Sequence, residues 1–307
     1  MQFLKSYFLL IVLLALIGFF ALQTDNFFSF ITLSTILSQL PALTFVAVGM
    51  TLVLIVGGID LSVGALMALS SAIIGILMVQ FNMPFALATA CALLCVAVVG
   101  ASSGYLSSWM RLPSFIVTLG VLEAARGLSY VISNSQTMYV GPKVQGLTDP
   151  IAGLGISSMM LLAFLVVIVS HIVLNHTVFG RQLIAIGSNR KAALMSGIKA
   201  DPKVLMVFVI SALLAGLAGL ANLSYLGSSD PNAGIGLELS AIAAAVIGGT
   251  SLMGGRGTII GTFLGVLIIA VLDSGLAQMG MSEPAKRMIT GAVIILAVLL
   301  DKWRVKQ

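Results

Sequence analysis

Residues 35–57 read TILSQLPALTFVAVGMTLVLIVG and contain no charged side chain. A helix of about 20 apolar residues crosses the roughly 30 Å hydrocarbon core of a bilayer. Because this stretch has that length and character, it predicts a membrane-spanning helix.

The chain on either side of this stretch has the same character. Of the 307 residues, 59% are hydrophobic and 8% are charged, whereas about a quarter of the residues of a soluble domain are charged. With 15 basic and 10 acidic residues, the surface cannot be covered by charge and must face lipid. The basic residues form no patch with interleaved aromatics, so no nucleic-acid partner is expected. The predicted fold class is all-α, a polytopic membrane helical bundle.

Apolar stretches separated by turn residues predict about ten transmembrane helices in one domain that covers residues 1–307. The first is too long for a cleavable signal peptide and is predicted to be a span. The stretches cover 6–24, 35–57, 61–80, 84–109, 113–133, 151–174, 204–226, 238–253, 258–279 and 285–300. The stretches 238–253 and 285–300 are short, and the turns at 58–60 and 254–257 are tight. Full spans and re-entrant elements are both open there.

The basic residues predict how the chain crosses the membrane, because loops rich in Lys and Arg stay in the cytoplasm. With the N-terminus inside, eleven fall on the cytoplasmic side and three on the other. The eleven are Lys5, Arg111, Arg181, Arg190, Lys191, Lys199, Lys203, Arg256, Lys302, Arg304 and Lys306; the three are Lys143, Lys286 and Arg287. Both termini are therefore predicted to be cytoplasmic.

A glycine pattern predicts an internal repeat. Gly57, Gly58, Leu61 and Gly64 recur with the same spacing at Gly248, Gly249, Leu252 and Gly255, 191 residues later. Because both copies enter from the same side, the prediction is a parallel repeat, as in many transporters. The alternative is chance, since helices that pack closely in membranes are rich in glycine.

The longest polar segment, 175–203, is predicted to be a cytoplasmic loop that contains a short helix. Ser188 or Asn189 would cap the start of this helix, and Gly197 would end it. Two functions are open: a docking element for a partner, and a basic anchor that touches anionic lipid.

This loop resembles the coupling segment of ABC importer permeases, Glu-Ala-Ala-x-x-x-Gly, and reads here Lys191-Ala192-Ala193 to Gly197, with lysine at the acidic position. Further blocks are similar to the ribose/xylose-type permease family. They are VGMT at 48–51, GGIDLSVG at 57–64, RQLIAIG at 181–187, GLEL at 236–239, AIAA at 241–244, GGTSL at 248–252, GGRG at 254–257, and Gly261.

The resemblance implies a permease subunit of an ATP-driven importer, which moves a sugar or sugar-like solute across the bacterial cytoplasmic membrane by alternating access. The implied partners are cytoplasmic ABC ATPase subunits, a second permease copy or paralogue, and a periplasmic or lipid-anchored solute-binding protein. It also implies that the coupling residues are Arg190, Lys191, Ala192, Ala193, Gly197 and Ile198. The chain has no phosphate-binding loop. It is therefore not expected to be an enzyme or to hold a cofactor, and ATP is expected to bind to the partner subunit.

Polar residues inside the spans are candidates for the solute pathway, because charges in the membrane are costly. Glu123 and Arg126 share a helix face and are expected to neutralise each other, as a structural pair or along the path. Asp60 with Ser62 is expected to cap the helix that follows, or to form a hinge with Gly57 and Gly58.

Gly248 and Gly249 are the candidate hinge of the second glycine motif. Asp273 is expected to reach the outer surface. The pairs His171 with His176 and Cys91 with Cys95 predict no metal site.

Two functions outside the importer hypothesis are also compatible with the sequence. A secondary transporter or channel that works without an ATPase would have similar helices and buried charges. A non-transporting membrane scaffold is the second alternative. Nothing in the sequence selects one solute.

Overall fold

The structure is a computed structural model that describes residues 2–24, 26–151 and 155–305. Its helices are α1 (Gln2–Gln23), α2 (Phe30–Ile55), α3 (Val63–Val79), α4 (Phe85–Ser108), α5 (Ser114–Ser133), α6 (Pro142–Gln145), α7 (Ser158–His176), α8 (Val178–Ser188), α9 (Arg190–Met195), α10 (Ala200–Leu226), α11 (Leu237–Ile247), α12 (Ile259–Gln278) and α13 (Glu283–Val305). The two short strands β1 (Met138–Tyr139) and β2 (Ser228–Ser229) pair in antiparallel orientation.

The all-α membrane architecture predicted from the sequence is confirmed, but the count of about ten spans is not. Within the described residues, six helices are long and apolar enough to cross a membrane: α2, α4, α5, α7, α10 and α12. The apolar stretches Phe8–Gln23, α3 and α11 are shorter. The 11 residues of α11 rise only about 16 Å, roughly half of the hydrocarbon thickness.

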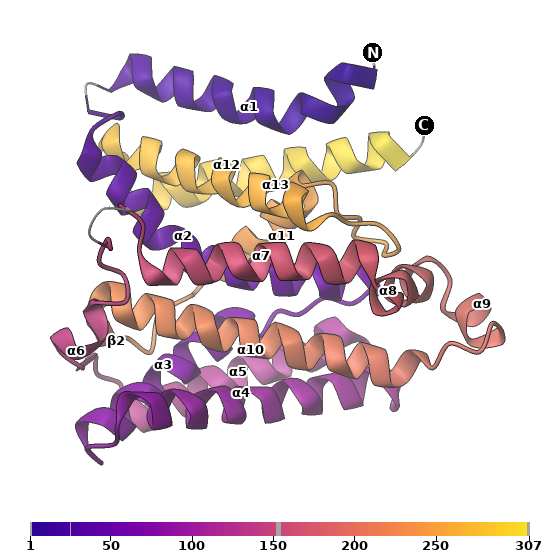
Figure 1. The fold of residues 1–307 in the computed structure, drawn as a ribbon, viewed down its shortest axis with the longest axis horizontal. Coiled ribbons are helices and arrows are strands. Elements are labelled where there is room, and N and C mark those ends of the chain that lie inside the picture. Colours follow the sequence, from indigo (N-terminus) through magenta and orange to yellow (C-terminus); the bar gives the residue numbers. More distant parts are fainter. Residues whose placement is uncertain (1, 25, 152–154, 306–307) are drawn as a thin grey trace.

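The helices run alongside one another and define two ends of a bundle (Figure 1). At one end, here called the α9 end, lie α8 and α9, together with the start of α1 and the end of α13. At the other, here called the β end, lie α6 and the strands. The start of α1 and the end of α13 therefore lie at the same end of the bundle.

Helices α2 and α10 form the centre of the bundle. Every residue of α2 from Thr44 to Ile55 is buried, which is typical of a helix surrounded by other helices. In contrast, α4, α5 and α7 expose large apolar side chains on their outer faces, among them Leu94, Val131 and Leu165. These faces are suited to contact with lipid.

The structure lends no support to the parallel repeat predicted from the glycine pattern. Gly57 follows the 26-residue α2, whereas the matching turn follows the 11-residue α11. The positive φ of Gly57, 80°, recurs at Gly249, which has φ 92°, and not at Gly248, which is right-handed helical. The pattern comes from two similar turns that end helices. The glycine with positive φ is Gly57 in the first turn and Gly249 in the second, whereas the sequence match pairs Gly57 with Gly248.

The contacts instead relate α2–α5 to α10–α13 in an antiparallel sense. Both α2 and α10 are long helices that lead through a non-helical connection into a shorter helix. Helix α10 packs on α3 and α4, and α2 packs on α11 and α12. The two long helices run in opposite directions, since Gln39 meets Tyr225 and Gly49 meets Ser211.

Some predictions fall outside the described part of the chain. Residues 152–154 of the predicted span 151–174 and Lys306 lie there, as do the side chains of Lys5, Lys143, Lys302 and Arg304.

Candidate functional site

The connection between α2 and α3 is a non-helical segment, 56–62, held by hydroxyl groups of α5. The backbone N–H of Ile59 donates to Ser114 Oγ at 2.9 Å, and that of Leu61 donates to Thr118 Oγ1 at 3.0 Å. Thr118 Oγ1 lies 3.2 Å from the carbonyl oxygen of Ile59. Backbone polar groups inside a membrane protein must find partners within the protein, and one face of α5 supplies them here.

Asp60 lies in this segment and is 2% exposed. Its carboxylate accepts hydrogen bonds from the N–H of Ser62 at 3.0 Å, from Ser62 Oγ at 2.6 Å and from Ser211 Oγ at 2.9 Å. Ser62, and not Asp60, is the N-cap residue of α3, and its side chain makes no capping bond. The capping prediction is corrected accordingly. Asp60 lies two residues before the N-cap, and its carboxylate links Ser62 at the start of α3 to Ser211 of α10.

The connection between α10 and α11 enters the bundle from the β end and meets α3. A Cβ on Gly64 would lie 2.3 Å from the carbonyl oxygen of Gly234 and 2.5 Å from Glu238 Oε2. These backbones therefore touch, and only glycine fits. The first turns of α3 and α11 meet at this contact, here called the central junction, with the carboxylate of Glu238 beside both. Helix N-termini attract negative charge, which explains an acidic side chain there.

Arg126 of α5 is bound to the α10–α11 connection. Its Nη1 donates to the carbonyl oxygen of Pro231 at 2.6 Å and to that of Ala233 at 2.7 Å. Among the described residues no ion pair joins it to Glu123, which is exposed. The predicted Glu123–Arg126 pair is therefore not a direct contact, and Glu123 acts on Arg126 only as a more distant charge. Carbonyl oxygens left free by a non-helical segment offer a fixed target to a guanidinium, which has several donors and reaches across helices.

At the α9 end, three glycine-bearing segments pack backbone to backbone and form what we call the glycine junction. The N–H of Gly255 donates to the carbonyl oxygen of Ile55 at 2.9 Å. A Cβ on Gly187 would lie 1.7 Å from the same oxygen, and one on Gly254 would lie 3.1 Å from the Cα of Gly57. The end of α8 therefore packs between the end of α2 and the turn after α11.

The candidate hinge glycines terminate helices. Gly57 and Gly249 adopt positive φ, and the N–H that follows each donates back into its helix: Gly58 to Val53 and Thr250 to Ala245, both at 2.9 Å. This is the Schellman arrangement of helix ends. Gly248 instead packs closely, since its Cβ would lie 2.4 Å from the backbone of Gly261.

The short helix predicted inside 175–203 is present as α9, and its predicted ends are confirmed. The N-cap is Asn189, whose Oδ1 accepts the N–H of Ala192 at 3.1 Å. Gly197 has φ 80° and ends the helix, while Ile198 N–H donates to Ala193 at 3.0 Å. Of the predicted coupling residues, Lys191, Ala192 and Gly197 are exposed, Ala193 is buried and Ile198 is half-buried. Sequence reasoning missed α8, which precedes it.

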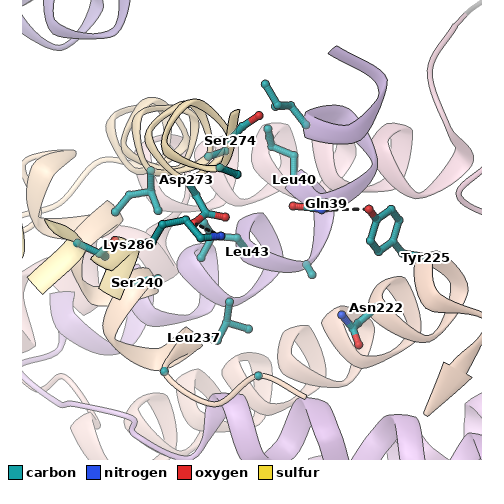
Figure 2. A pocket seen from close by; sticks show the side chains of 18 of the residues that line it. Gln39, Leu40, Leu43, Asn222, Tyr225, Leu237, Ser240, Asp273, Ser274 and Lys286 are labelled. Carbon is teal, nitrogen blue, oxygen red and sulfur yellow. Dashed lines mark hydrogen bonds and ion pairs between the residues drawn. The ribbon is translucent and has the colours of Figure 1, made fainter. Parts of the chain in front are cut away.

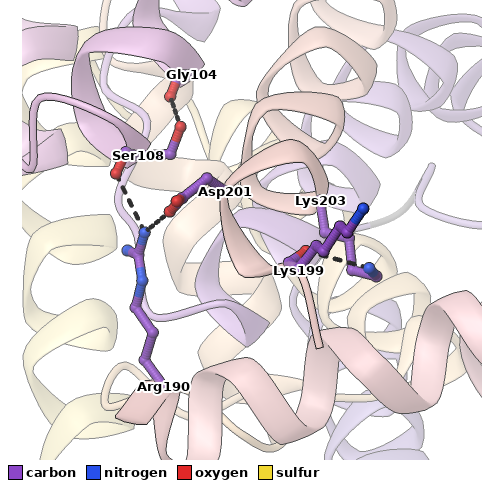
Figure 3. Close-up of polar contacts among 6 residues, drawn as sticks. All are labelled: Gly104, Ser108, Arg190, Lys199, Asp201 and Lys203. Carbon is purple, nitrogen blue, oxygen red and sulfur yellow. Dashed lines mark hydrogen bonds and ion pairs between the residues drawn. The ribbon is translucent and has the colours of Figure 1, made fainter. Parts of the chain in front are cut away.

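Arg190 faces the bundle (Figure 3). Its Nη2 forms an ion pair with Asp201 Oδ1 of α10 and donates to the carbonyl oxygen of Ser108, at the end of α4, at 3.2 Å. It therefore fastens α9 to α4 and α10. In the same view, Lys203 Nζ donates to the carbonyl oxygen of Lys199 at 3.1 Å.

A cavity of about 670 Å³ opens at the β end. Gln39, Leu40 and Leu43 come from α2, and Asn222 and Tyr225 from α10, while Asp273, Ser274 and Lys286 from α12 and α13 face them (Figure 2). Gln39 Nε2 donates to the hydroxyl of Tyr225 at 3.0 Å. Lys286 Nζ lies 3.6 Å from Asp273 Oδ1 and also pairs with Glu283. Asp273, which is expected to reach the outer surface, is half exposed and paired with Lys286.

The sequence contained signals for some of the residues that were missed. Ser114 and Thr118 are hydroxyl residues one helical turn apart in an apolar stretch, and Glu238 is a charge at the start of a predicted span. Within the described residues, no group of three His, Cys, Asp or Glu side chains could hold a metal ion.

Comparison with known proteins gives consistent matches. The family described as "Branched-chain amino acid transport system / permease component" matches residues 32–298. The ribose import permease protein of Escherichia coli (strain K12) is 38% identical, covering 95% of this chain and 92% of that protein. The fructose import permease protein of Rhizobium meliloti is 35% identical, covering 96% of this chain and 84% of that protein.

The D-allose transport system permease protein of Escherichia coli (strain K12) is 34% identical, covering 97% of this chain and 90% of that protein. No solved structure matches the chain.

Proposed function

Because this chain belongs to the sugar permease family of ABC transporters, we propose that it is the membrane-spanning subunit of an ATP-driven importer for a monosaccharide or a similar small polar solute. The observation that carries this proposal is the match to sugar import permeases over more than 90% of this chain. A permease that matches over nearly its whole length shares the transport role, although a fold alone would not assign it.

The proposed partners are cytoplasmic ATPase subunits, a second permease copy or paralogue, and a solute-binding protein outside the membrane. The α9 end faces the cytoplasm in this proposal, in agreement with the distribution of basic residues. The ATPase subunits bind α9, which exposes 90% of Met195 and 45% of Leu194. Two apolar side chains exposed side by side on a cytoplasmic helix are suited to a partner groove.

The contacts of α8 and α9 support a route for the movement. A push on α9 reaches α4 and α10 through Arg190 and reaches α2 through the glycine junction at Gly187. Both central helices are thus engaged from one element. In alternating access, such rigid contacts would let ATP-driven closure of the ATPases reorient the bundle around a fixed solute position.

Reconstitution tests the proposal. The permease, its ATPase and its binding protein are placed in proteoliposomes, and uptake of radiolabelled D-ribose, D-fructose and D-allose is measured with and without ATP. We expect uptake of at least one sugar only when ATP and all partners are present. Equal uptake by the permease alone without ATP would contradict the proposal and favour a secondary transporter or channel.

A further inference from the structure

The cavity at the β end has the dimensions and the lining of a binding site for a small molecule. Its volume of about 670 Å³ lies in the usual range for ligand pockets, and such pockets combine apolar walls with a few placed polar groups. Leu40, Leu43 and Leu237 supply apolar wall. Hydroxyl and amide groups supply the polar part, and they come from Thr35, Ser38, Gln39, Asn222, Ser240 and Ser274.

The charged groups of the cavity balance one another. Two acidic residues, Asp273 and Glu283, and two basic residues, Lys286 and Arg287, line it. The side chain of Lys286 is 11% exposed and contacts both acids. Because Lys286 is already paired and Arg287 is exposed to solvent, the cavity does not offer a buried unpaired charge to a charged solute.

The amide groups of the cavity retain hydrogen-bonding capacity. Asn222 lies against the cavity (Figure 2), and its Oδ1 is buried without a hydrogen-bond partner among the described residues, so a rotation of the amide would turn this oxygen toward a solute. Gln39 donates one N–H to Tyr225 and keeps its second N–H and its oxygen for a solute. Solute hydroxyl groups donate and accept, so they satisfy both kinds of group at once.

The cavity extends to the central junction. Gly234, Gly236 and Leu237 line it, and Gly234 touches Gly64 at the central junction. A solute in the cavity would therefore rest on the segment where the non-helical connection, α3 and α11 meet.

We infer that this cavity is a binding site at which the permease itself recognises its solute through Gln39, Asn222 and Tyr225. The solute is a neutral molecule rich in hydroxyl groups. This inference rests on the proposed transport function and adds the site and the residues to it. It predicts that the permease contributes to selectivity after the binding protein has delivered the solute.

The test uses the complete reconstituted complex and compares Gln39→Leu and Asn222→Leu with Gln80→Leu. Gln80 is an exposed residue at the end of α3, outside the cavity, so it is the matched control. D-ribose, D-fructose, D-allose and L-leucine are the probes. We expect uptake of the transported sugar to fall about tenfold or more in both cavity variants, since each leaves a solute hydroxyl unpaired. The ratio among the sugars should change, while ATP hydrolysis and complex assembly match those of the control.

Distinct outcomes separate this inference from the proposed function. If the unaltered complex moves a sugar with ATP, and both cavity variants transport all sugars in the same proportions as Gln80→Leu, the inference is wrong and the function stands. Loss of assembly in the cavity variants would also overturn it, because the cavity would then be a subunit contact. If the unaltered complex takes up L-leucine in preference to the sugars, the inferred solute class is wrong.

Discussion

At the scale of single residues, the hydroxyl of Thr118 contacts backbone groups outside its own helix. It accepts the N–H of Leu61 and lies within hydrogen-bond distance of the carbonyl oxygen of Ile59. Both groups belong to a segment that forms neither helix nor strand. Thr118 is fully buried, so water cannot replace these partners.

We therefore expect Thr118→Val to lower the free energy of unfolding by about 1–3 kcal/mol, the usual cost of leaving a buried polar group without a partner. Thermal unfolding of the protein in detergent measures this as a lower midpoint. Thr118→Ser keeps the hydroxyl and should lose less.

Thr44→Val is the matched control, because Thr44 is also buried and, within the described part of the chain, its hydroxyl bonds only to the carbonyl of Leu40 in its own helix. That carbonyl keeps its helical partner when the hydroxyl is removed. If the unfolding midpoint falls equally in Thr44→Val and Thr118→Val, the bonds from Thr118 to residues 59–61 add nothing to the stability of the protein.

Residue-level features could be predicted from the sequence where they depend on near neighbours. Asn189 and Gly197 were predicted as the ends of α9 because capping involves residues three or four apart. The partner of Arg126 could not be predicted, since Pro231 and Ala233 are more than 100 residues away. Helix periodicity brings Glu123 to the same face but does not reveal a stronger partner on another element.

At the scale of elements, the glycine junction sets how closely α8 approaches α2. A methyl group on Gly187 would overlap the carbonyl oxygen of Ile55, which also accepts the N–H of Gly255. Backbone atoms cannot move aside without displacing both helices.

Gly187→Ala should therefore cost about 1–3 kcal/mol of unfolding free energy or more through overpacking, and it should abolish uptake by the reconstituted complex. Gly120→Ala is the control, because a Cβ at Gly120 of α5 meets no atom within 4 Å. Full uptake by Gly187→Ala would show that α8 does not need this contact.

Arg190 makes the second connection of this element, and its ion pair with Asp201 is more than a third exposed. Exposed pairs contribute only about 0–1 kcal/mol to stability. We therefore expect Arg190→Ala to leave the unfolding midpoint nearly unchanged but to lower the amount of sugar taken up per ATP hydrolysed several-fold.

Lys203→Ala removes a nearby positive charge whose one hydrogen bond among the described residues is to the carbonyl of Lys199, and it should behave like the unaltered protein. An unchanged ratio of uptake to ATP hydrolysis in Arg190→Ala would refute a coupling role for this side chain.

Element positions followed well from hydropathy, since each predicted stretch contains a helix. The relation between elements did not follow. Gly57 and Gly248 suggested a parallel repeat because helix ends of the same type use glycine wherever they occur. The antiparallel relation of α2–α5 to α10–α13 depends on which helices pack together, and a spacing pattern along one chain does not contain that information.

At the scale of the whole molecule, α8, α9, the start of α1 and the end of α13 gather at one end of the bundle. Basic residues retained on the cytoplasmic side predict that this end is inside. A fluorescent protein fused after Gln307 should therefore be fluorescent, and alkaline phosphatase fused at the same position should be inactive.

Fusions after Asn134, which follows α5 at the β end, should give the opposite result. Phosphatase activity at the C-terminal fusion together with fluorescence at the Asn134 fusion would reverse the proposed orientation.

The 11-residue length of α11 has a consequence for how the protein enters its membrane. A segment of this length is too short to be inserted as an independent span. Arg126 is synthesised about 100 residues before the carbonyl groups of Pro231 and Ala233 that bind it. Helix α5 is long and apolar enough to cross the membrane by itself, but the guanidinium of Arg126 gains these carbonyl partners only after α10 and α11 have been made, so the second half of the chain completes the packing of the first.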